Sequence, residues 1–417
     1  MLSRALGERI TEWQWAPWLA PLLGFALALA AGWLLSVVVA RVCRHYGLLD
    51  APRGRHGHAI PAPRLGGVAI FLAFALAATL LYHPSGPYEA HVVTGLFAAA
   101  GLTVAVMAVD DARGLPPGFR LLAQTAAALL VMFPAAHGMI IEVIHNPLGQ
   151  GADAIIPLPL WVAVPFTWFW IVGMMNTINW VDGVDGLAGG VVAIAAAVMA
   201  VVSWMLGQAS VAALCAMLAG ASAGFVLLNW RPGKLFMGDS GAMFLGLALA
   251  TLAGIGGAKL ATMLLLLGVP ILDAARVIVR RVGRGESPAR ADRSHLHHRL
   301  LASGFSQRQV ALLFYGVTTA FGGFTILAAY LQAHAWQWSA VLHITPWLRL
   351  ALTEAPTALG LILIPTLTVV IWVALARRRA RHAAMTTQPL PRKPILPGRE
   401  LAASGSGTRP RPAPPGG

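Results

Sequence analysis

Long apolar segments alternate with short polar loops along most of this chain. Each segment holds about 20 mostly apolar residues, the length that an α-helix needs to cross a bilayer. We therefore predict an all-α integral membrane protein, a helical bundle of about eleven transmembrane helices. The loop 142–159 contains Gly and Pro and predicts a short hairpin or a re-entrant piece. The predicted spans cover residues 18–40, 66–82, 91–109, 121–140, 158–176, 187–206, 210–228, 241–257, 260–280, 309–332 and 357–376.

The composition agrees with a membrane protein. Hydrophobic residues make up 57% of the chain and charged residues only 11%, whereas soluble domains carry roughly 25% charged residues. The first apolar segment is too long for the core of a signal peptide, so we expect it to remain as a spanning helix. The two cysteines, Cys43 and Cys215, are far apart, which argues against a disulfide or a thiolate metal site.

The basic residues predict an orientation. An external N-terminus leaves only four of the 30 Lys and Arg residues outside: Arg4, Arg9, Lys259 and Arg349. The positive-inside rule therefore predicts a multi-pass protein of the bacterial inner membrane with its C-terminus in the cytoplasm. We expect a transmembrane catalytic domain over residues 1–376. Residues 377–417 form a basic, Pro- and Gly-rich tail that we predict to be disordered and to contact membrane lipids rather than nucleic acid.

A stripe of polar residues follows the fifth span. Asn176, Asn179, Asp182 and Asp185 stand three residues apart, and this spacing places side chains on one face of a helix. An aspartate at the bilayer centre costs roughly 2.5–3.5 kcal/mol, so two of them would not lie in lipid without a function. A solvated loop between two helices is one interpretation. We favour the other, a polar floor at the membrane edge that binds a metal and a charged ligand.

Two adjacent carboxylates, Asp110 and Asp111, follow the third span. Because they repel each other, we expect a raised pKa for at least one of them or a cation nearby. Gly114 and Pro116 are typical of a helix that simply ends here. However, two negative charges at a helix C-terminus oppose the helix macrodipole, so we favour a functional role.

The loop from Gly233 to Gly241 precedes the eighth span. Gly238 and Gly241 allow a close approach of the backbone, and the helix N-terminus that follows offers free N–H groups to a phosphate. Asp239 is well placed to bind a metal. Phe236 suits stacking on a planar base, with packing at the membrane interface as an equal alternative.

Histidine and arginine side chains form two more clusters. Three histidines and two arginines fall within seven residues: Arg293, His295, His297, His298 and Arg299. Their spacing matches no usual zinc pattern and the arginines attract phosphate, so an anion clamp is favoured over a metal site. The basic segment 53–67, which includes Arg64, is either a phosphate-cradling loop or a topology anchor.

These clusters share the predicted cytoplasmic face. Carboxylates with a divalent ion can handle a pyrophosphate, and Arg and His side chains can hold its charge in the transition state. A site at the membrane edge can take one substrate from the lipid and the other from the cytoplasm. The sequence therefore predicts phosphoryl transfer onto a lipid acceptor, in a cleft at the cytoplasmic face.

Four ordered motifs resemble one family: DDARGLPP, NTINWVDGVDGLAGG, KLFMGDSGAMFLG and DRSHLHHRL. Over roughly residues 45–330 the chain resembles the polyprenyl-phosphate N-acetylhexosamine-1-phosphate transferases of glycosyltransferase family 4. The resemblance implies an enzyme that uses Mg²⁺, or Mn²⁺. It would transfer a HexNAc 1-phosphate, here GlcNAc 1-phosphate, from a UDP-N-acetylhexosamine to undecaprenyl phosphate and release UMP. This step initiates cell-envelope polysaccharides such as lipopolysaccharide or teichoic acid.

The resemblance also implies roles for individual residues. Asp110 and Asp111 would handle the lipid phosphate, with Asp110 as the base. Asp239 would hold the metal together with Asn179 and would share the catalytic role. Many relatives carry Lys at the position of His56, and its nucleotide contact would pass here to Arg55 or Arg64, or be lost. The substrate-binding set would be Arg64, Asn176, Asp182, Asp185, Phe236, His295, His297, His298 and Arg299.

Several alternatives stay open at this point. The His-x-His-His-Arg-Leu form after Asp292 and Arg293 resembles the users of UDP-GlcNAc, but the donor could instead be UDP-MurNAc-pentapeptide or another UDP-HexNAc. A secondary transporter is a remote alternative. It would need ionisable groups near mid-membrane and at both gates, whereas the polar clusters of this chain are predicted to lie at one face. A homodimer, a covalent intermediate and the identity of the downstream polymer are equally open.

Overall fold

The computed structural model describes residues 18–50, 62–133, 138–145, 155–230, 233–255, 260–286 and 294–342, with four isolated positions between 363 and 374. The chain divides into two units, Met1–Leu375 and Ala376–Gly417. The predicted tail lies outside the described residues. The predicted span 357–376 does too, apart from the isolated positions.

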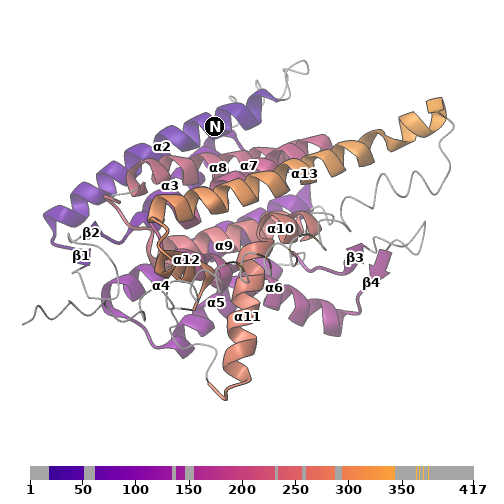
Figure 1. Cartoon of the computed structure of the whole chain (residues 1–417). Coiled ribbons are helices and arrows are strands. Elements are labelled where there is room, and N and C mark those ends of the chain that lie inside the picture. Colours follow the sequence, from indigo (N-terminus) through magenta and orange to yellow (C-terminus); the bar gives the residue numbers. More distant parts are fainter. Residues whose placement is uncertain are drawn as a thin grey trace, which may run out of the picture. The chain divides into compact units, whose positions relative to one another are not determined.

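The first unit is predominantly helical, as predicted (Figure 1). Its helices are α2 (Leu19–His45), α3 (Gly66–Leu81), α4 (Pro87–Arg113), α5 (Pro117–Met132), α6 (Leu160–Val181), α7 (Leu187–Met205), α8 (Ala209–Asn229), α9 (Gly238–Gly254), α10 (Leu260–Leu266), α11 (Gly268–Val282), α12 (Leu296–Ala302) and α13 (Gln307–Leu342). Its strands are β1 (Leu49–Asp50), β2 (Ala62–Pro63), β3 (Val143–His145) and β4 (Ile155–Pro157).

Six helices in the described part of the chain are long and apolar enough to cross a membrane: α2, α4, α6, α7, α8 and α13 up to Leu331. The apolar helices α3, α5 and α9 are shorter, between 10 and 17 residues. The bent pair of α10 and α11 raises the number of spans to as many as seven when it is taken as one. The structure therefore agrees with a multi-pass all-α membrane protein.

Two predicted spans differ from the observed helices. The span predicted over 260–280 consists of two helices, because α10 and α11 meet at Leu267 with a bend of 80°. Pro270 explains the break, since it has no N–H to donate to the carbonyl of Leu266 and its ring crowds that carbonyl. The helix predicted over 121–140 ends at Met132 instead, one residue before Phe133, which precedes a proline and leaves the helical region.

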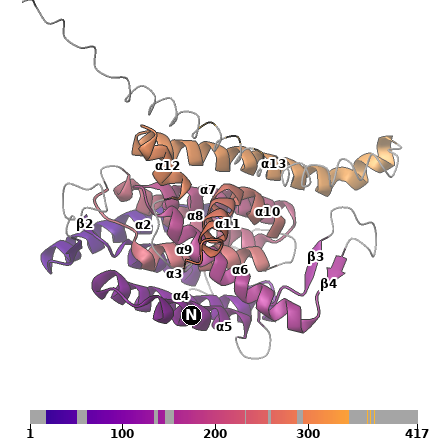
Figure 2. The ribbon, with the colours of Figure 1, turned by 60° about the horizontal axis from the view of Figure 1, so that its bottom comes forward.

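The helices of the first unit are arranged in layers (Figure 2). Helix α13 packs on α7 and α12 on one side, while α4 and α5 pack together on the other, and α9 contacts α4 and α6 between them. Nearly all residues of α9 are buried. The most deeply enclosed helix is therefore the one whose first turn carries Asp239.

Small residues bring α2 and α8 into close contact. A Cβ atom added to Gly220 or Gly224 would collide with the backbone carbonyl oxygens of Phe25 and Leu29. Association of helices in lipid relies on this kind of backbone approach, because hydrophobic burial supplies little driving force there. Larger side chains at these glycines would force the two helices apart.

Two short antiparallel strand pairs lie beside the helices. In β1 and β2, Leu49 pairs with Pro63. In β3 and β4, Val143 pairs with Pro157. The second pair confirms the hairpin alternative for the segment 142–159, while β1 and β2 lead into the Arg64 segment.

Candidate functional site

The carboxylates of Asp110 and Asp111 stand in the last turn of α4. That helix ends at Arg113 and is capped by Gly114, whose φ of 72° lies in the left-handed region that glycine tolerates. The N–H of Leu115 donates to Asp110 Oδ1 over 2.5 Å, and the Asp110 side chain is buried. The helix stop, which the sequence offered as the alternative to a functional role, is present at this turn, and the functional role stays a prediction.

Arg120, in the first turns of α5, joins two of the predicted site residues. Its Nε lies 3.2 Å from Asp110 Oδ2, and its guanidinium also donates to Asp239 Oδ2. A guanidinium between two carboxylates offsets their mutual repulsion. The sequence analysis predicted a cation near Asp110 but did not identify Arg120. One feature of the sequence could have identified it, because Arg120 is the only Lys or Arg between positions 114 and 140.

Asp111 caps the N-terminus of α9. Its Oδ1 accepts the N–H of Asp239 at 2.8 Å, and its Oδ2 accepts the N–H and hydroxyl of Ser240 at 3.2 and 2.9 Å. A carboxylate at this position is favoured by the helix macrodipole. The expectation that these N–H groups are free for a phosphate is therefore wrong for Asp239 and Ser240, whose donors are taken by Asp111.

The loop before α9 pairs with the Arg64 segment. Phe236 N–H donates to the carbonyl of Pro63 at 2.7 Å, and Gly66 N–H donates to the carbonyl of Phe236 at 2.9 Å. Gly238 has a φ of 73°, and a Cβ there would collide with the Arg64 carbonyl oxygen and the Asp111 carboxylate. Glycine is required at this position because both the backbone conformation and the space exclude a side chain.

The predicted stripe of four polar residues is not one helical face. Helix α6 ends at Val181, so Asn176 and Asn179 are helical whereas Asp182 and Asp185 lie in the following turn. Gly186 allows this change of direction with a φ of 78°.

Amide side chains hold the ends of this segment. Asn176 donates to Gln124 Oε1 of α5 at 2.8 Å. Buried Asn229 accepts the Gly186 N–H at 2.7 Å and donates to the Leu235 carbonyl at 2.8 Å. Asp185 accepts the N–H of Gly233 at 3.2 Å. These bonds join the turn after α6 to the loop before α9, and Gln124 and Asn229 were not identified from the sequence.

Negative charge accumulates around Asp182. Burial, followed by the neighbouring carboxylates of Asp239 and Asp111, raises the pKa of Asp182 to about 8, although Arg64 acts in the opposite direction. Carboxylates that raise the pKa of a neighbouring carboxyl group indicate a local excess of negative charge. Binding of a cation would relieve this excess.

The histidines of α12 lie against the turn after α6. Buried His297 approaches Gly183 so closely that a Cβ on this glycine would collide with its imidazole. Burial, together with His298 and His295, lowers the pKa of His297 well below its usual value. The ring of His295 lies 5.6 Å from that of Trp180 at the end of α6. His298 and Arg299 are half-buried beside them.

The loops predicted to converge therefore do so at one end of the bundle, where bonds or close contacts join α4, α5, α6, α9 and α12. No group of three or more His, Cys, Asp or Glu side chains in the described ranges is arranged to hold a metal ion. The chemistry of the donors nevertheless fits a hard divalent cation, which prefers carboxylate and amide oxygens. Asp239 and Asn179 are the predicted ligands, and their metal binding stays a prediction.

The comparisons with known proteins identify the family. Residues 93–257, which contain both Asp110 and Asp239, match the model for glycosyl transferase family 4. A probable undecaprenyl-phosphate N-acetylglucosaminyl 1-phosphate transferase of Bacillus subtilis (strain 168) is 31% identical over 299 residues, 70% of this chain and 80% of that protein. The chain belongs to glycosyl transferase family 4.

Other family 4 proteins show similar coverage. A decaprenyl-phosphate N-acetylglucosaminephosphotransferase of Mycolicibacterium smegmatis (strain ATCC 700084 / mc(2)155) is 35% identical over 316 residues, 69% of this chain and 75% of that protein. An undecaprenyl-phosphate alpha-N-acetylglucosaminyl 1-phosphate transferase of Salmonella typhi is 30% identical over 304 residues, 70% of this chain and 79% of that protein. The family predicted from the four motifs is therefore confirmed.

Proposed function

We propose that this protein transfers GlcNAc 1-phosphate from UDP-GlcNAc to undecaprenyl phosphate and releases UMP. The observation that carries the proposal is the carboxylate cluster of Asp110 and Asp239, bridged by Arg120, at one end of a membrane bundle of family 4. The printed names of the three relatives support it, because each names an N-acetylglucosaminyl phosphate transfer and a polyprenyl phosphate.

The reaction exchanges one phosphoanhydride bond for another. An oxygen of the lipid phosphate bonds to the phosphorus that carries the sugar, and the bond from this phosphorus to the bridging oxygen breaks. UMP leaves with the bridging oxygen and its electron pair. The products are the lipid-linked sugar pyrophosphate and UMP, so no oxidant or other reactant is needed.

The carboxylate cluster supports a role at the lipid phosphate. We propose that Asp110 receives any proton from this phosphate, and that Arg120 attracts the anionic substrates. Asp111 would act by fixing the first turn of α9, on which Asp239 stands. We propose Asp239 and Asn179 as ligands of Mg²⁺, with Mn²⁺ as a substitute. When bound, this ion would neutralise phosphate charge and polarise the reacting phosphorus.

The remaining residues surround the position proposed for the donor. Asp182, Asp185 and Phe236 would contact the nucleotide, with Arg64 and Asn176 beside them. The α12 cluster of His295, His297, His298 and Arg299 would hold the pyrophosphate or the sugar. Because His297 lies against the turn that carries Asp182, one donor molecule could reach both groups.

We also propose that the first unit contains eleven spans in a bacterial inner membrane. Its N-terminus would be external, and the site and the tail 377–417 would face the cytoplasm. Reporter fusions after residues 50, 145 and 286 test this orientation. Cytoplasmic signals are expected for the first and third and an external signal for the second, whereas the reverse pattern would contradict the proposal.

The decisive experiment uses purified protein in detergent with undecaprenyl phosphate. UMP release is measured with UDP-GlcNAc, UDP-GalNAc or UDP-MurNAc-pentapeptide, with and without EDTA. We expect release with UDP-GlcNAc that stops in EDTA and returns with Mg²⁺. A lipid product from the pentapeptide donor alone would overturn the donor assignment, and full activity in EDTA would overturn the metal proposal. Decaprenyl phosphate in a parallel assay tests the choice of lipid.

A further inference from the structure

A buried carboxylate in α11 contacts the histidine cluster from behind. Asp273 stands nearly two turns after the break at Leu267 and is 6% exposed. It belongs to none of the four motifs, and the sequence analysis did not single it out. Nothing in the proposed reaction uses it, although a buried carboxylate requires a partner that compensates for its burial.

One oxygen of Asp273 accepts two bonds from the start of α12. Oδ2 lies 3.0 Å from Nδ1 of His295 and 2.9 Å from the N–H of Leu296. Because this oxygen acts as the acceptor, Nδ1 of His295 carries a hydrogen. The second nitrogen, Nε2, lies on the other side of the ring and is left for chemistry at the site. Carboxylates that hold histidine ligands in metal sites fix ring and tautomer in the same way.

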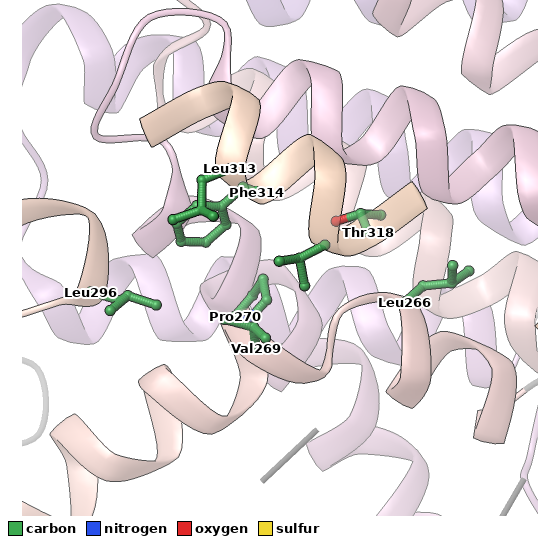
Figure 3. A pocket seen from close by; sticks show the side chains of 8 residues that line it. Leu266, Val269, Pro270, Leu296, Leu313, Phe314 and Thr318 are labelled. Atoms are coloured by element: carbon green, nitrogen blue, oxygen red, sulfur yellow. The ribbon is translucent and has the colours of Figure 1, made fainter. Parts of the chain in front are cut away.

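Helix α12 is short and packs on apolar side chains. This helix has only seven residues, and an apolar pocket lies behind it, lined by Leu296 together with residues of α10, α11 and α13 (Figure 3). Pro270 and Phe314 form part of the same wall. Apolar contacts are non-directional, whereas two hydrogen bonds to one buried oxygen fix the orientation of a short helix.

The orientation of α12 affects the site directly. The centre of the His295 ring lies 5.6 Å from that of the Trp180 ring. It lies 6.0 Å from the centre of the His297 ring, on which it stacks. His297 in turn lies against Gly183 in the turn that carries Asp182. A rotation of α12 would therefore move both imidazoles relative to the carboxylates.

We propose that Asp273 is a positioning residue, which holds His295 and the first turn of α12 in the orientation that binds the anionic donor. The inference rests on the proposed function, because it assumes that the α12 cluster contacts the pyrophosphate of the UDP-sugar. Asp273 itself touches no substrate and acts through His295.

The test compares two substitutions of Asp273 with one substitution of its partner: Asp273→Asn, Asp273→Ala and His295→Ala. In the first variant the Leu296 N–H still requires an acceptor, so it orients the introduced amide with its oxygen in the place of Oδ2. Asp273→Asn therefore keeps both bonds, whereas Asp273→Ala removes them. Kinetics with UDP-GlcNAc and undecaprenyl phosphate are measured for each, along with the melting temperature in detergent.

We expect Asp273→Ala to lower kcat/KM for UDP-GlcNAc on the order of 10–100-fold. The KM for the donor should rise, while the KM for the lipid should stay within about twofold. Asp273→Asn should stay within about fivefold of the wild type. In the His295→Ala background, Asp273→Ala should add less than about a twofold loss, because the two residues act as one unit.

A matched control is available in Glu89, a buried carboxylate in α4 that accepts bonds from hydroxyl groups far from α12. Glu89→Ala should lower the melting temperature without changing the donor KM. If Asp273→Ala behaves like this control, its role is structural and the proposal is wrong.

Two further outcomes would overturn the proposal. If Asp273→Asn loses as much activity as His295→Ala, the charge of Asp273 is needed rather than its hydrogen bonds. This result is informative even when Asp273→Ala does not fold. Losses that multiply in the double variant would show independent roles. The wild type separates failure of the proposed function from failure of the inference about Asp273. If the proposed function is wrong, the wild type itself releases no UMP from any donor.

Discussion

The two ends of α4 carry buried carboxylates in opposite settings. Near the first turn, Glu89 accepts hydroxyl bonds from Tyr82 at 2.6 Å, from Ser210 at 2.9 Å and from Ser85. In the last turn, Asp110 faces Arg120, which it shares with Asp239. The helix macrodipole favours a negative charge at the first position and disfavours it at the second.

This difference separates a carboxylate with a structural role from one that we propose to be functional. Glu89 fastens the loop before α4 to the start of α8, and its neighbours are neutral hydroxyl groups. The hydroxyl of Tyr82 donates to one oxygen of Glu89. At the other end, several carboxylates lie around one arginine. Because one positive charge does not neutralise them all, this arrangement favours the binding of further cations.

The largest expected effect is the loss of activity in Asp239→Asn. The change keeps the shape of the side chain but removes the charge that Arg120 and the proposed metal ion contact. UMP release should fall on the order of 10³-fold, while the melting temperature stays close to that of the wild type. Glu89→Gln serves as the control and should keep activity within about threefold. Similar activities of the two variants would erase the distinction between the ends of α4.

Arg120→Gln should have the next largest effect. Removing the guanidinium leaves Asp110 and Asp239 without their shared partner, so we expect a loss of activity on the order of 10–100-fold. Added Mg²⁺ should raise the melting temperature of this variant more than that of the wild type, since the carboxylates then depend on the ion. Arg120→Lys is the matched control and should recover part of the activity. An equal response to Mg²⁺ in all three proteins would contradict this account.

Glu89→Ala tests the structural end of α4. The change leaves the hydroxyls of Tyr82, Ser85 and Ser210 without their acceptor. Ser85 is exposed and the other two are half-buried, so we expect a cost at the lower end of the range of about 1–3 kcal/mol that applies to buried groups. We expect a lower melting temperature in detergent and an unchanged rate of UMP release per folded molecule. A large fall in kcat with no change in melting temperature would assign function to this end as well.

The smallest effect concerns pH and His297. Burial lowers the pKa of His297 in the folded protein, so the unfolded chain binds a proton near pH 6.5 that the folded protein does not. Stability should therefore fall as pH decreases below about 6.5, by up to about 1.4 kcal/mol per pH unit. Melting temperatures between pH 7.5 and 5.5 should show a shallower fall for His297→Asn. Parallel curves would show that His297 does not cause the acid sensitivity.

Much of the fold could be predicted from local sequence. The apolar segments predicted α2, α4, α6, α7 and α8 to within a few residues, because transfer into lipid depends on each segment's own side chains. The break between α10 and α11 was missed although Pro270 was visible. The apolar run around it outweighed this single residue in a window of about 20 residues.

The sequence predicted which residues belong to the candidate site better than it predicted which residues they contact. The spacing of Asp182 and Asp185 suggested a helical stripe, but Gly183 and Gly186 turn the chain instead. Asp111 seemed paired with Asp110 by sequence adjacency, whereas in the fold it caps α9, whose first turn lies 128 residues away. Contacts over such separations depend on the depth and rotation of helices, which local patterns do not specify.

The sequence by itself determined that this is a multi-span helical membrane protein of family 4, with four polar clusters that are predicted to carry its chemistry. Hydrophobicity and motif spacing are properties of short segments, so they can be read without knowing the fold. Only the tertiary structure decided that Arg120 bridges Asp110 and Asp239, and that Asp273 holds His295. These pairings join different helices, and only the packing of the bundle determines which donor meets which acceptor.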